Sequence, residues 1–180
     1  MKKQKTTLKM IVALAMLSAI SIICGKYLGI NAGEFMRFSL ENMPIILAGM
    51  AFGPLAGGAV GLVADLVGCV MVGWVPIPWV SVGACLIGVV AGVTMLMLKK
   101  TSLPTPIITV ITVVAAHFVG SVLIKTIGLA AIYSMPYPLL MLWRLLNYAI
   151  VGTIDGIIVH VLLSNKGIKQ QIKEIGGKEI

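Results

Sequence analysis

Three polar side chains share one face of the last long apolar segment of the sequence. Arg144, Asn147 and Asp155 fall on the same side of an α-helix at 3.6 residues per turn. Ionisable groups in apolar surroundings are costly unless they are paired or hydrated. This face is therefore predicted to point at a cavity or at neighbouring helices. Snorkelling toward an interface explains Arg144 alone, but it does not explain Asn147 on the same side.

Other cations and rings extend this prediction to a binding pocket. Arg37, Lys125 and Arg144 are all expected in the outer half of the molecule, where they form an electropositive pocket for an anionic ligand. For Lys125 the alternative is that its side chain simply snorkels to the membrane interface. For Arg37 the alternative is that it lies in a solvated loop. Three rings are candidate walls of the pocket: Tyr27, Phe38 and Trp79.

The remaining buried polar residues have more than one interpretation. His117, in the middle of a long apolar segment, fits an interhelical hydrogen bond or a ligand contact equally well. Asp65 and Asp155 are expected deeper in the molecule. We interpret them as structural polar contacts, such as helix caps or interhelical partners.

The sequence gives little support for catalysis or for a cofactor. It contains no His-Glu-x-x-His, no Gly-x-Ser-x-Gly, no clustered metal ligands and no phosphate-binding glycine loop with its lysine. We predict no enzyme activity, no bound metal and no cofactor held by this chain. Cys24, Cys69 and Cys85 are widely spaced in apolar runs and are expected to be buried thiols.

Composition indicates the elements that must position these residues. Of the 180 residues, 59% are hydrophobic and only 11% are charged, which predicts an integral membrane protein. The formal net charge is +8, yet most lysines lie in the two tails and at Lys99 and Lys100, without interleaved aromatics. This pattern is typical of membrane anchors and argues against nucleic-acid binding.

Lysine positions and apolar length predict an all-α membrane protein with six transmembrane helices. The positive-inside rule places the N-terminal lysines, Lys99, Lys100 and the C-terminal lysines on the cytoplasmic side, so both termini are cytoplasmic. Breaks are expected at residues 53–58, 74–79 and 133–137, where Gly, Pro and aromatic residues gather. Residues 1–180 form a single membrane domain with approximate helices 7–30, 42–53, 56–73, 80–98, 104–132 and 138–164.

Small residues recur four apart and predict close helix packing. The pairs include Gly49 with Gly53, Gly57 with Gly61 and Gly88 with Gly92. Packing within the chain and docking onto another membrane protein are both open for each pair. Ala15 and Ala19 on the first helix form the best candidate for partner docking.

The sequence resembles the substrate-binding S components of energy-coupling factor (ECF) vitamin transporters, and among them the folate-specific type. The resemblance covers nearly the whole chain. The motifs that carry it are RFSLENMPIILAG at 37–49, FGPLAG at 52–57, ADLVG at 64–68 and WRLLN at 143–147. Related S components share the proline–glycine stretch while differing in ligand.

The resemblance implies a six-helix vitamin-binding subunit of the cell membrane. It also implies that this subunit acts together with a transmembrane coupling protein and two cytoplasmic ATPases. The ATPases, and not this chain, would hydrolyse ATP. In the family an alanine stripe on the first helix meets the coupling protein, and Ala15 and Ala19 match it here. The bound subunit is thought to topple in the membrane and so carry its pocket inward.

Folate would fit the pocket inferred from the residues. The carboxylates of folate would bind cations, and we assign this role to Arg37, Lys125 and Arg144. The ring of folate would form hydrogen bonds, and we assign these to His117 and Asn147. Another vitamin, such as pantothenate, thiamine, riboflavin or a queuosine precursor, is the alternative within the family. A self-sufficient carrier with Asp65, His117 and Asp155 as a proton relay is the alternative outside it.

Overall fold

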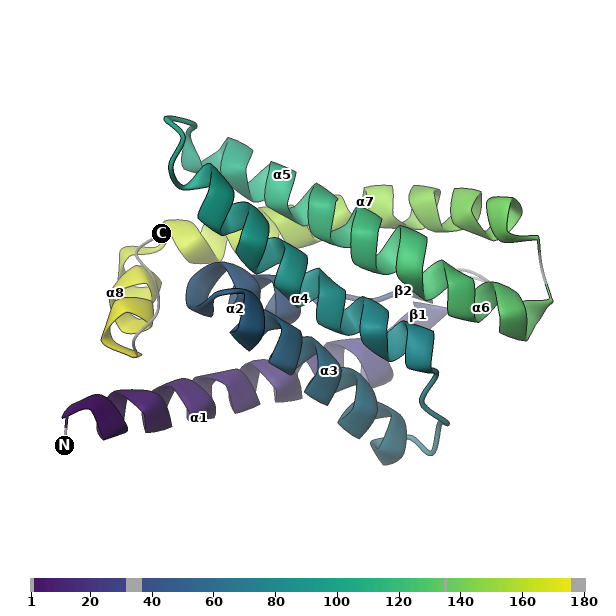
Figure 1. Cartoon of the computed structure of the whole chain (residues 1–180), viewed down its shortest axis with the longest axis horizontal. Helices are drawn as coiled ribbons and strands as arrows, with labels where there is room; N and C mark the ends of the chain where they lie inside the picture. The colour runs from purple at the N-terminus through teal and green to yellow at the C-terminus, as the bar shows by residue number, and fades with distance from the viewer. Residues whose placement is uncertain (1, 32–36, 135, 176–180) are drawn as a thin grey trace.

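Helices make up nearly all of the described chain (Figure 1). The computed structural model describes residues 2–31, 37–134 and 136–175. The first half contains α1 (Lys2–Ile22), the π-helix η1 (Ile23–Tyr27), β1 (Ile30–Asn31), β2 (Arg37–Phe38), α2 (Asn42–Phe52) and α3 (Pro54–Met71). The second half contains α4 (Pro78–Leu98), α5 (Thr105–Ala116), the π-helix η2 (His117–Ile124), α6 (Lys125–Tyr133), α7 (Tyr137–Ser164) and α8 (Lys166–Ile175).

Five helical segments are long and apolar enough to cross a membrane. They are Leu8–Tyr27, Pro54–Met71, Pro78–Leu98, Thr105–Ile132 and Tyr137–Ser164. The predicted sixth crossing corresponds to α2, which has 11 residues and extends about 16 Å at 1.5 Å per residue. The apolar layer of a bilayer is about 30 Å thick. The described residues therefore contain five full-length candidate spans, and a count of six stays a prediction.

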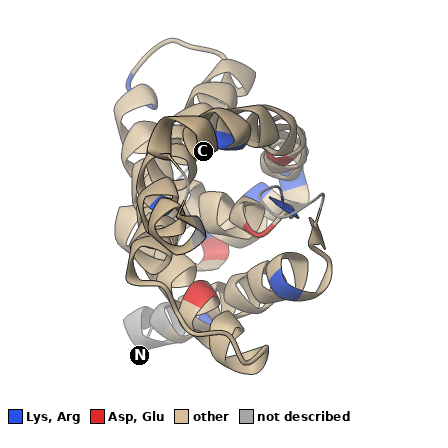
Figure 2. Cartoon of the chain, turned by 90° about the vertical axis from the view of Figure 1, so that its right-hand side faces the viewer, with Lys and Arg blue, Asp and Glu red and all other residues tan. Residues whose placement is uncertain are grey.

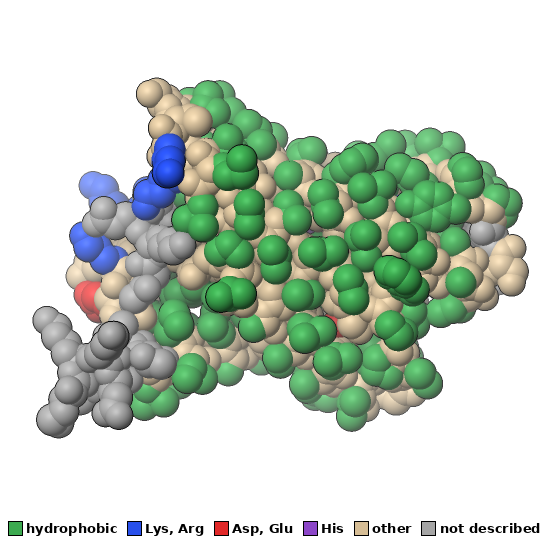
Figure 3. Space-filling view, in the orientation of Figure 1, with side chains coloured by type: hydrophobic (Ala, Val, Ile, Leu, Met, Phe, Trp, Pro, Cys, Tyr) green, Lys and Arg blue, Asp and Glu red, His purple; other side chains and the backbone are tan. Residues whose placement is uncertain are grey.

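The start of α1, the α4–α5 connection and α8 lie at the same end of the bundle (Figure 1). Basic side chains gather at this end, while hydrophobic side chains cover the middle of the molecule (Figure 3). The β1–β2 hairpin, the α3–α4 loop and the α6–α7 turn lie at the other end (Figure 1). We refer to these as the basic end and the hairpin end. That the basic end is cytoplasmic stays a prediction of the positive-inside rule.

Glycines allow α2, α3 and α4 to pack with their backbones in contact. A Cβ added at Gly88 on α4 would come within 2.1 Å of the carbonyl carbon and oxygen of Gly57 on α3. A Cβ at Gly61 would come within 2.1 Å of the Ala84 carbonyl oxygen, and one at Gly49 within 2.4 Å of the Gly88 oxygen. These glycines therefore pack within the chain, which was one of the two interpretations of their spacing.

Each predicted break contains a boundary between two helices, although α3 already begins at Pro54 and α4 at Pro78, inside the predicted breaks. Gly53 lies between α2 and α3 with φ at 102°, a value that L side chains rarely adopt, and Pro54 opens α3. The chain also leaves helical structure between Met71 and Pro78. Helix α2 itself is deeply buried because α1, α3, α4 and α7 surround it.

Helix α8 was not among the predicted segments. Asn165 caps its start, since the Asn165 side-chain oxygen accepts hydrogen bonds from the amides of Gly167 and Ile168. Ile168 and Ile172 pack against the core, whereas Lys166 is exposed. This helix is too polar to cross a membrane, so a search for apolar runs passes over it.

Candidate functional site

A cavity of about 740 Å³ lies toward the hairpin end of the bundle. Viewed from that end, acidic and basic segments of several helices surround the middle of the molecule (Figure 2). The charged residues that line the cavity are Lys26, Arg37, Glu41, Asp65, Lys125 and Arg144. Four cations against two carboxylates leave two net positive charges. The cavity therefore favours an anionic ligand.

Two of the cations form ion pairs across the bundle. Lys125 Nζ at the start of α6 donates to Glu41 Oε1 at 3.1 Å. Lys26 Nζ in η1 lies 3.7 Å from Asp65 Oδ1 on α3. Asp65 also accepts a 2.7 Å hydrogen bond from the Ser81 hydroxyl on α4. These contacts join η1, α3, α4, α6 and the segment just before α2.

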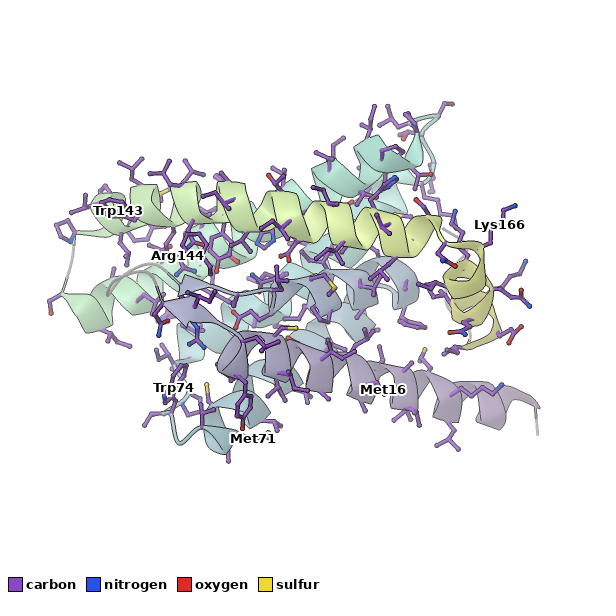
Figure 4. All side chains as sticks on the ribbon, turned by 180° about the vertical axis from the view of Figure 1, so that it is seen from behind. Met16, Met71, Trp74, Trp143, Arg144 and Lys166 are labelled. Carbon is purple, nitrogen blue, oxygen red and sulfur yellow. The ribbon has the colours of Figure 1, made fainter. Side chains whose placement is uncertain are left out.

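The two arginines are held by backbone carbonyls and by aromatic faces. Arg37 Nη2 donates to the Gly25 carbonyl oxygen, and its guanidinium lies 4.9 Å from the centre of the Trp74 ring. Arg144 Nε donates to the Ser121 carbonyl oxygen at 3.0 Å. Figure 4 shows Arg144 and Trp74 near the hairpin end, one on α7 and the other after α3. Both guanidinium groups are thus oriented without a carboxylate partner among the described residues.

Tyr148 supports Arg144 from the next turn of α7. The Arg144 guanidinium lies 5.2 Å from the centre of the Tyr148 ring, and Arg144 Nη2 donates to the Tyr148 hydroxyl at 3.3 Å. Residues four apart on a helix are neighbours on one face. The contact fixes the guanidinium from a second side.

Hydrogen bonds attach the hairpin to the helices around the cavity. The hairpin pairs Ile30 with Phe38 and Asn31 with Arg37. Asn147 Nδ2 on α7 donates to the Arg37 carbonyl oxygen at 3.2 Å. The Ser21 hydroxyl on α1 donates to the Glu41 carbonyl oxygen at 2.6 Å. The backbone that carries Arg37 and Glu41 is therefore held at both sides of the bundle.

A second site of buried polar groups lies apart from the cavity. His117 Nε2 at the start of η2 is 3.0 Å from Asp155 Oδ2 on α7, and both side chains are almost fully buried. His117 lines a separate, mostly apolar groove of about 640 Å³ between α5, η2 and α7. Tyr148 lines both spaces, and its ring centre is 5.0 Å from that of His117.

Nothing in the described residues assembles a metal site, since no three His, Cys, Asp or Glu side chains come together as ligands there. The charged groups of the cavity are instead suited to noncovalent binding, with guanidinium and ammonium donors beside aromatic faces. Such an arrangement holds an anionic molecule by charge and by ring contacts.

In a comparison with models of protein families, residues 5–170 match the family "ECF-type riboflavin transporter, S component". The chain belongs to this family. The family is the substrate-binding part of a transporter and is not an enzyme family. A comparison with curated protein sequences finds no match.

Solved structures of other S components share the fold of this S component. A structure of FolT bound with folic acid is 21% identical and has a TM-score of 0.68, covering 84% of this chain and 90% of its own. An S component for biotin from an ECF-type ABC transporter is 20% identical, with a TM-score of 0.67 and coverage of 96% and 98%. A third, the S component of a bacterial ECF transporter, is 22% identical, with a TM-score of 0.65 and coverage of 87% and 94%.

Four of the eight predicted binding residues of this S component line the cavity: Arg37, Lys125, Arg144 and Asn147. The other four do not line it: Tyr27, Phe38, Trp79 and His117. Tyr27 and Trp79 are at least half exposed, and His117 is bonded to Asp155. Asp155 bonds to His117, in agreement with the structural contact predicted for it. Asp65 bonds to Ser81, but it also lines the cavity beside Lys26.

Sequence reasoning missed four charged or aromatic residues of the cavity: Lys26, Glu41, Trp74 and Tyr148. A signal existed for Tyr148, because it follows Arg144 by one helical turn. Trp74 and Trp79 lie at the two ends of the same proline-rich segment, and their spacing does not indicate which ring faces the cavity. Lys26 and Glu41 belong to the charged stretch that precedes α2, where no periodicity separates cavity-facing residues from solvated ones.

The Glu41–Lys125 pair predicts a loss of stability in acid. Glu41 lies just before α2, outside the five long spans, and the Lys125 ammonium lowers the pKa of its carboxyl from 4.5 to about 2 against the opposing effect of burial. A lowered folded-state pKa gives stability that is complete above about pH 4.5 and is lost as the pH falls toward 2. At 1.36 kcal/mol per pKa unit the full contribution is about 3 kcal/mol. The loss of stability is measured by thermal unfolding in detergent at pH 7 and at pH 3.

The matched control is Glu41→Gln, which keeps the shape of the side chain and removes its titration. We expect the melting temperature of this variant to fall less than that of the wild type between pH 7 and pH 3. An equal fall in both proteins would contradict the assignment of this pH dependence to Glu41.

Proposed function

We propose that this S component binds a vitamin from the outer side of the cell membrane and delivers it for import. The coupling protein and two ATPases would act with it, and those ATPases would supply the energy from ATP. The observation that carries the proposal is the cavity at the hairpin end, with four cations, two carboxylates and two aromatic rings in its lining. The membership of the chain in the S-component family supports the same role.

Folate is the first candidate ligand. Its two carboxylates match the net positive charge of the cavity, and its flat ring matches the faces of Trp74 and Tyr148. Riboflavin is the second candidate, because the name of the matched family contains it. Riboflavin is uncharged, however, and leaves the excess positive charge without a partner. Thiamine is cationic and is disfavoured for the same electrostatic reason.

The docking surface for the coupling protein is proposed on α1. Ala15 and Ala19 are exposed on this helix, as are its larger apolar neighbours Val12 and Met16. Met16 points away from the bundle in Figure 4. Small side chains on an otherwise apolar helix permit close approach of a second helix within the membrane.

Replacing Arg144 by alanine is predicted to weaken vitamin binding by about 30-fold or more, since loss of one partner from a buried charge contact typically costs 2–5 kcal/mol. The purified protein is titrated without ATP against folate, riboflavin, thiamine, biotin and pantothenate, with tryptophan fluorescence as the signal. Trp74 lines the cavity and is the expected reporter, so Trp74→Phe should remove most of the fluorescence change.

The control is Lys166→Gln, at the basic end and far from the cavity (Figure 4). It should bind as the wild type does. If Arg144→Ala binds every vitamin as tightly as Lys166→Gln, the cavity is not the binding site. If none of the five vitamins binds the wild-type protein, the proposed function itself fails.

A self-sufficient proton-coupled carrier is less well supported. Its relay would need Asp65, His117 and Asp155 to act together. Asp65 instead contacts Ser81 and Lys26 at the cavity, whereas His117 and Asp155 bond to each other. Uptake into vesicles that contain only this chain and a proton gradient would favour the carrier.

A further inference from the structure

The six charged residues of the cavity form two groups with different charge balance. Lys26, Asp65, Glu41 and Lys125, here called the quartet, contain two cations and two carboxylates. Arg37 and Arg144, here called the arginine pair, have no carboxylate partner among the described residues. The excess positive charge of the cavity therefore resides in the arginine pair.

The quartet is a compact and internally neutral cluster. Its two ion pairs measure 3.1 Å and 3.7 Å between nitrogen and oxygen. All four side chains also line one small void, together with residues of α1, α2, α3 and α4. An added carboxylate here would meet Glu41 and Asp65 as well as the two lysines. Neutral donors and acceptors meet no such repulsion, because carboxylates accept from ring N–H groups and ammonium groups donate to ring carbonyls.

The arginine pair is oriented but not neutralised. Its described partners are the Gly25 and Ser121 carbonyl oxygens, the Tyr148 hydroxyl and two aromatic rings, none of which carries a full negative charge. Arg37 Nε is buried and has no hydrogen-bond partner in the described part of the chain. A guanidinium has five N–H donors, so both arginines keep donors for a ligand.

One hydrogen bond connects the backbones that carry the two arginines. Asn147, on the α7 turn after Arg144, donates to the Arg37 carbonyl oxygen at 3.2 Å. The arginine pair and the quartet line the same cavity. A single ligand can therefore contact both groups at once.

We infer that this S component selects an organic acid with an uncharged polar ring, whose carboxylate binds the arginine pair and whose ring hydrogen-bonds to the quartet. The inference rests on the proposed function and narrows its ligand class. A cationic ligand would face the unpaired guanidinium groups. A ring without an acidic group would leave those groups desolvated and unpaired, which is costly.

The test compares matched ligands that differ in their acidic group. The probes are folic acid, pteroic acid and pterin, which carry two, one and no carboxylates, together with biotin and its uncharged primary amide. For the series that binds, the acid is expected to bind about 30-fold or more tightly than its uncharged counterpart. Calorimetry on the purified full chain in detergent gives the ratio.

Arginine variants then assign this preference to the arginine pair. Arg37→Gln and Arg144→Gln should bring the ratio of acid to uncharged affinity close to one, chiefly by weakening the acid. Arg37→Lys and Arg144→Lys keep the positive charge and should retain a clear preference for the acid. A general loss of folding would weaken acid and uncharged probe alike, and melting temperatures identify any unfolded variant.

The outcomes separate this inference from the proposed function. Binding of acid and uncharged probe with equal affinity overturns the inference and leaves vitamin binding intact. A preference for the acid that persists in both glutamine variants overturns the role of the arginine pair. Absence of binding by all five probes, while riboflavin, thiamine or pantothenate binds, overturns the inference alone. Absence of binding by the probes and by these three vitamins overturns both the proposed function and the inference.

Discussion

Replacing Gly88 by valine is expected to prevent this S component from accumulating as a folded protein. A Cβ at this position would lie within 2.1 Å of the Gly57 carbonyl group and 2.7 Å from the Gly58 nitrogen. These are backbone atoms of α3, so no side-chain rotation relieves the clash. Overpacking that side chains can absorb costs about 1–3 kcal/mol, and a clash between two helix backbones should exceed that range.

Fluorescence-detected gel filtration of a tagged protein measures this effect as loss of the monodisperse peak. Gly88→Ala should already lower the yield and the melting temperature. Gly156→Ala is the matched control, because the nearest atom to a Cβ there is Val113 Cγ1 at 4.0 Å. A normal peak and melting temperature for Gly88→Val would show that α3 and α4 do not pack through these glycines.

Replacing Asp155 by alanine is expected to give the second large effect, through the bond between α7 and η2. Asp155 is fully buried and its carboxylate meets His117 Nε2 at 3.0 Å. The described residues offer no other hydrogen-bond partner to His117, whose Nδ1 is buried without one. Leaving a buried polar group without its hydrogen-bond partner costs about 1–3 kcal/mol. We expect a fall of roughly 5 °C in the melting temperature.

Two variants make this prediction specific. Asp155→Asn keeps an oxygen that can accept from His117 and should lose much less stability than Asp155→Ala. Thr153→Ala changes an exposed residue on the same helix, whose hydroxyl bonds only to the Ala149 carbonyl oxygen, and should melt close to the wild type. Equal melting temperatures for Asp155→Ala and Asp155→Asn would contradict a structural role for the bond.

The bond between His117 and Asp155 also bears on vitamin binding. His117 was assigned as a ligand contact by its resemblance to the family, while its position alone left an interhelical bond equally open. The structure contains the interhelical bond, and His117 lies in the lining of the apolar groove. Tyr148 lines both the groove and the cavity and contacts both His117 and Arg144.

The sequence by itself determined that this is a helical membrane protein, and it identified the polar residues that are energetically costly inside an apolar segment. Long apolar runs require a membrane, glycines and prolines interrupt those runs, and an arginine or aspartate inside a run needs a partner. These properties are local, since each depends on a residue and its neighbours along the chain. They were sufficient to predict the helical breaks and the face formed by Arg144, Asn147 and Asp155.

Tertiary structure decided which of these residues meet. Pairing of Lys125 with Glu41 and of His117 with Asp155 joins segments far apart in the chain, and no helical period contains that information. The same is true of Trp74, which lines the cavity while Trp79 does not. Charge balance is a property of the assembled cavity, because a cation binds a ligand strongly only where the fold has left it without a carboxylate.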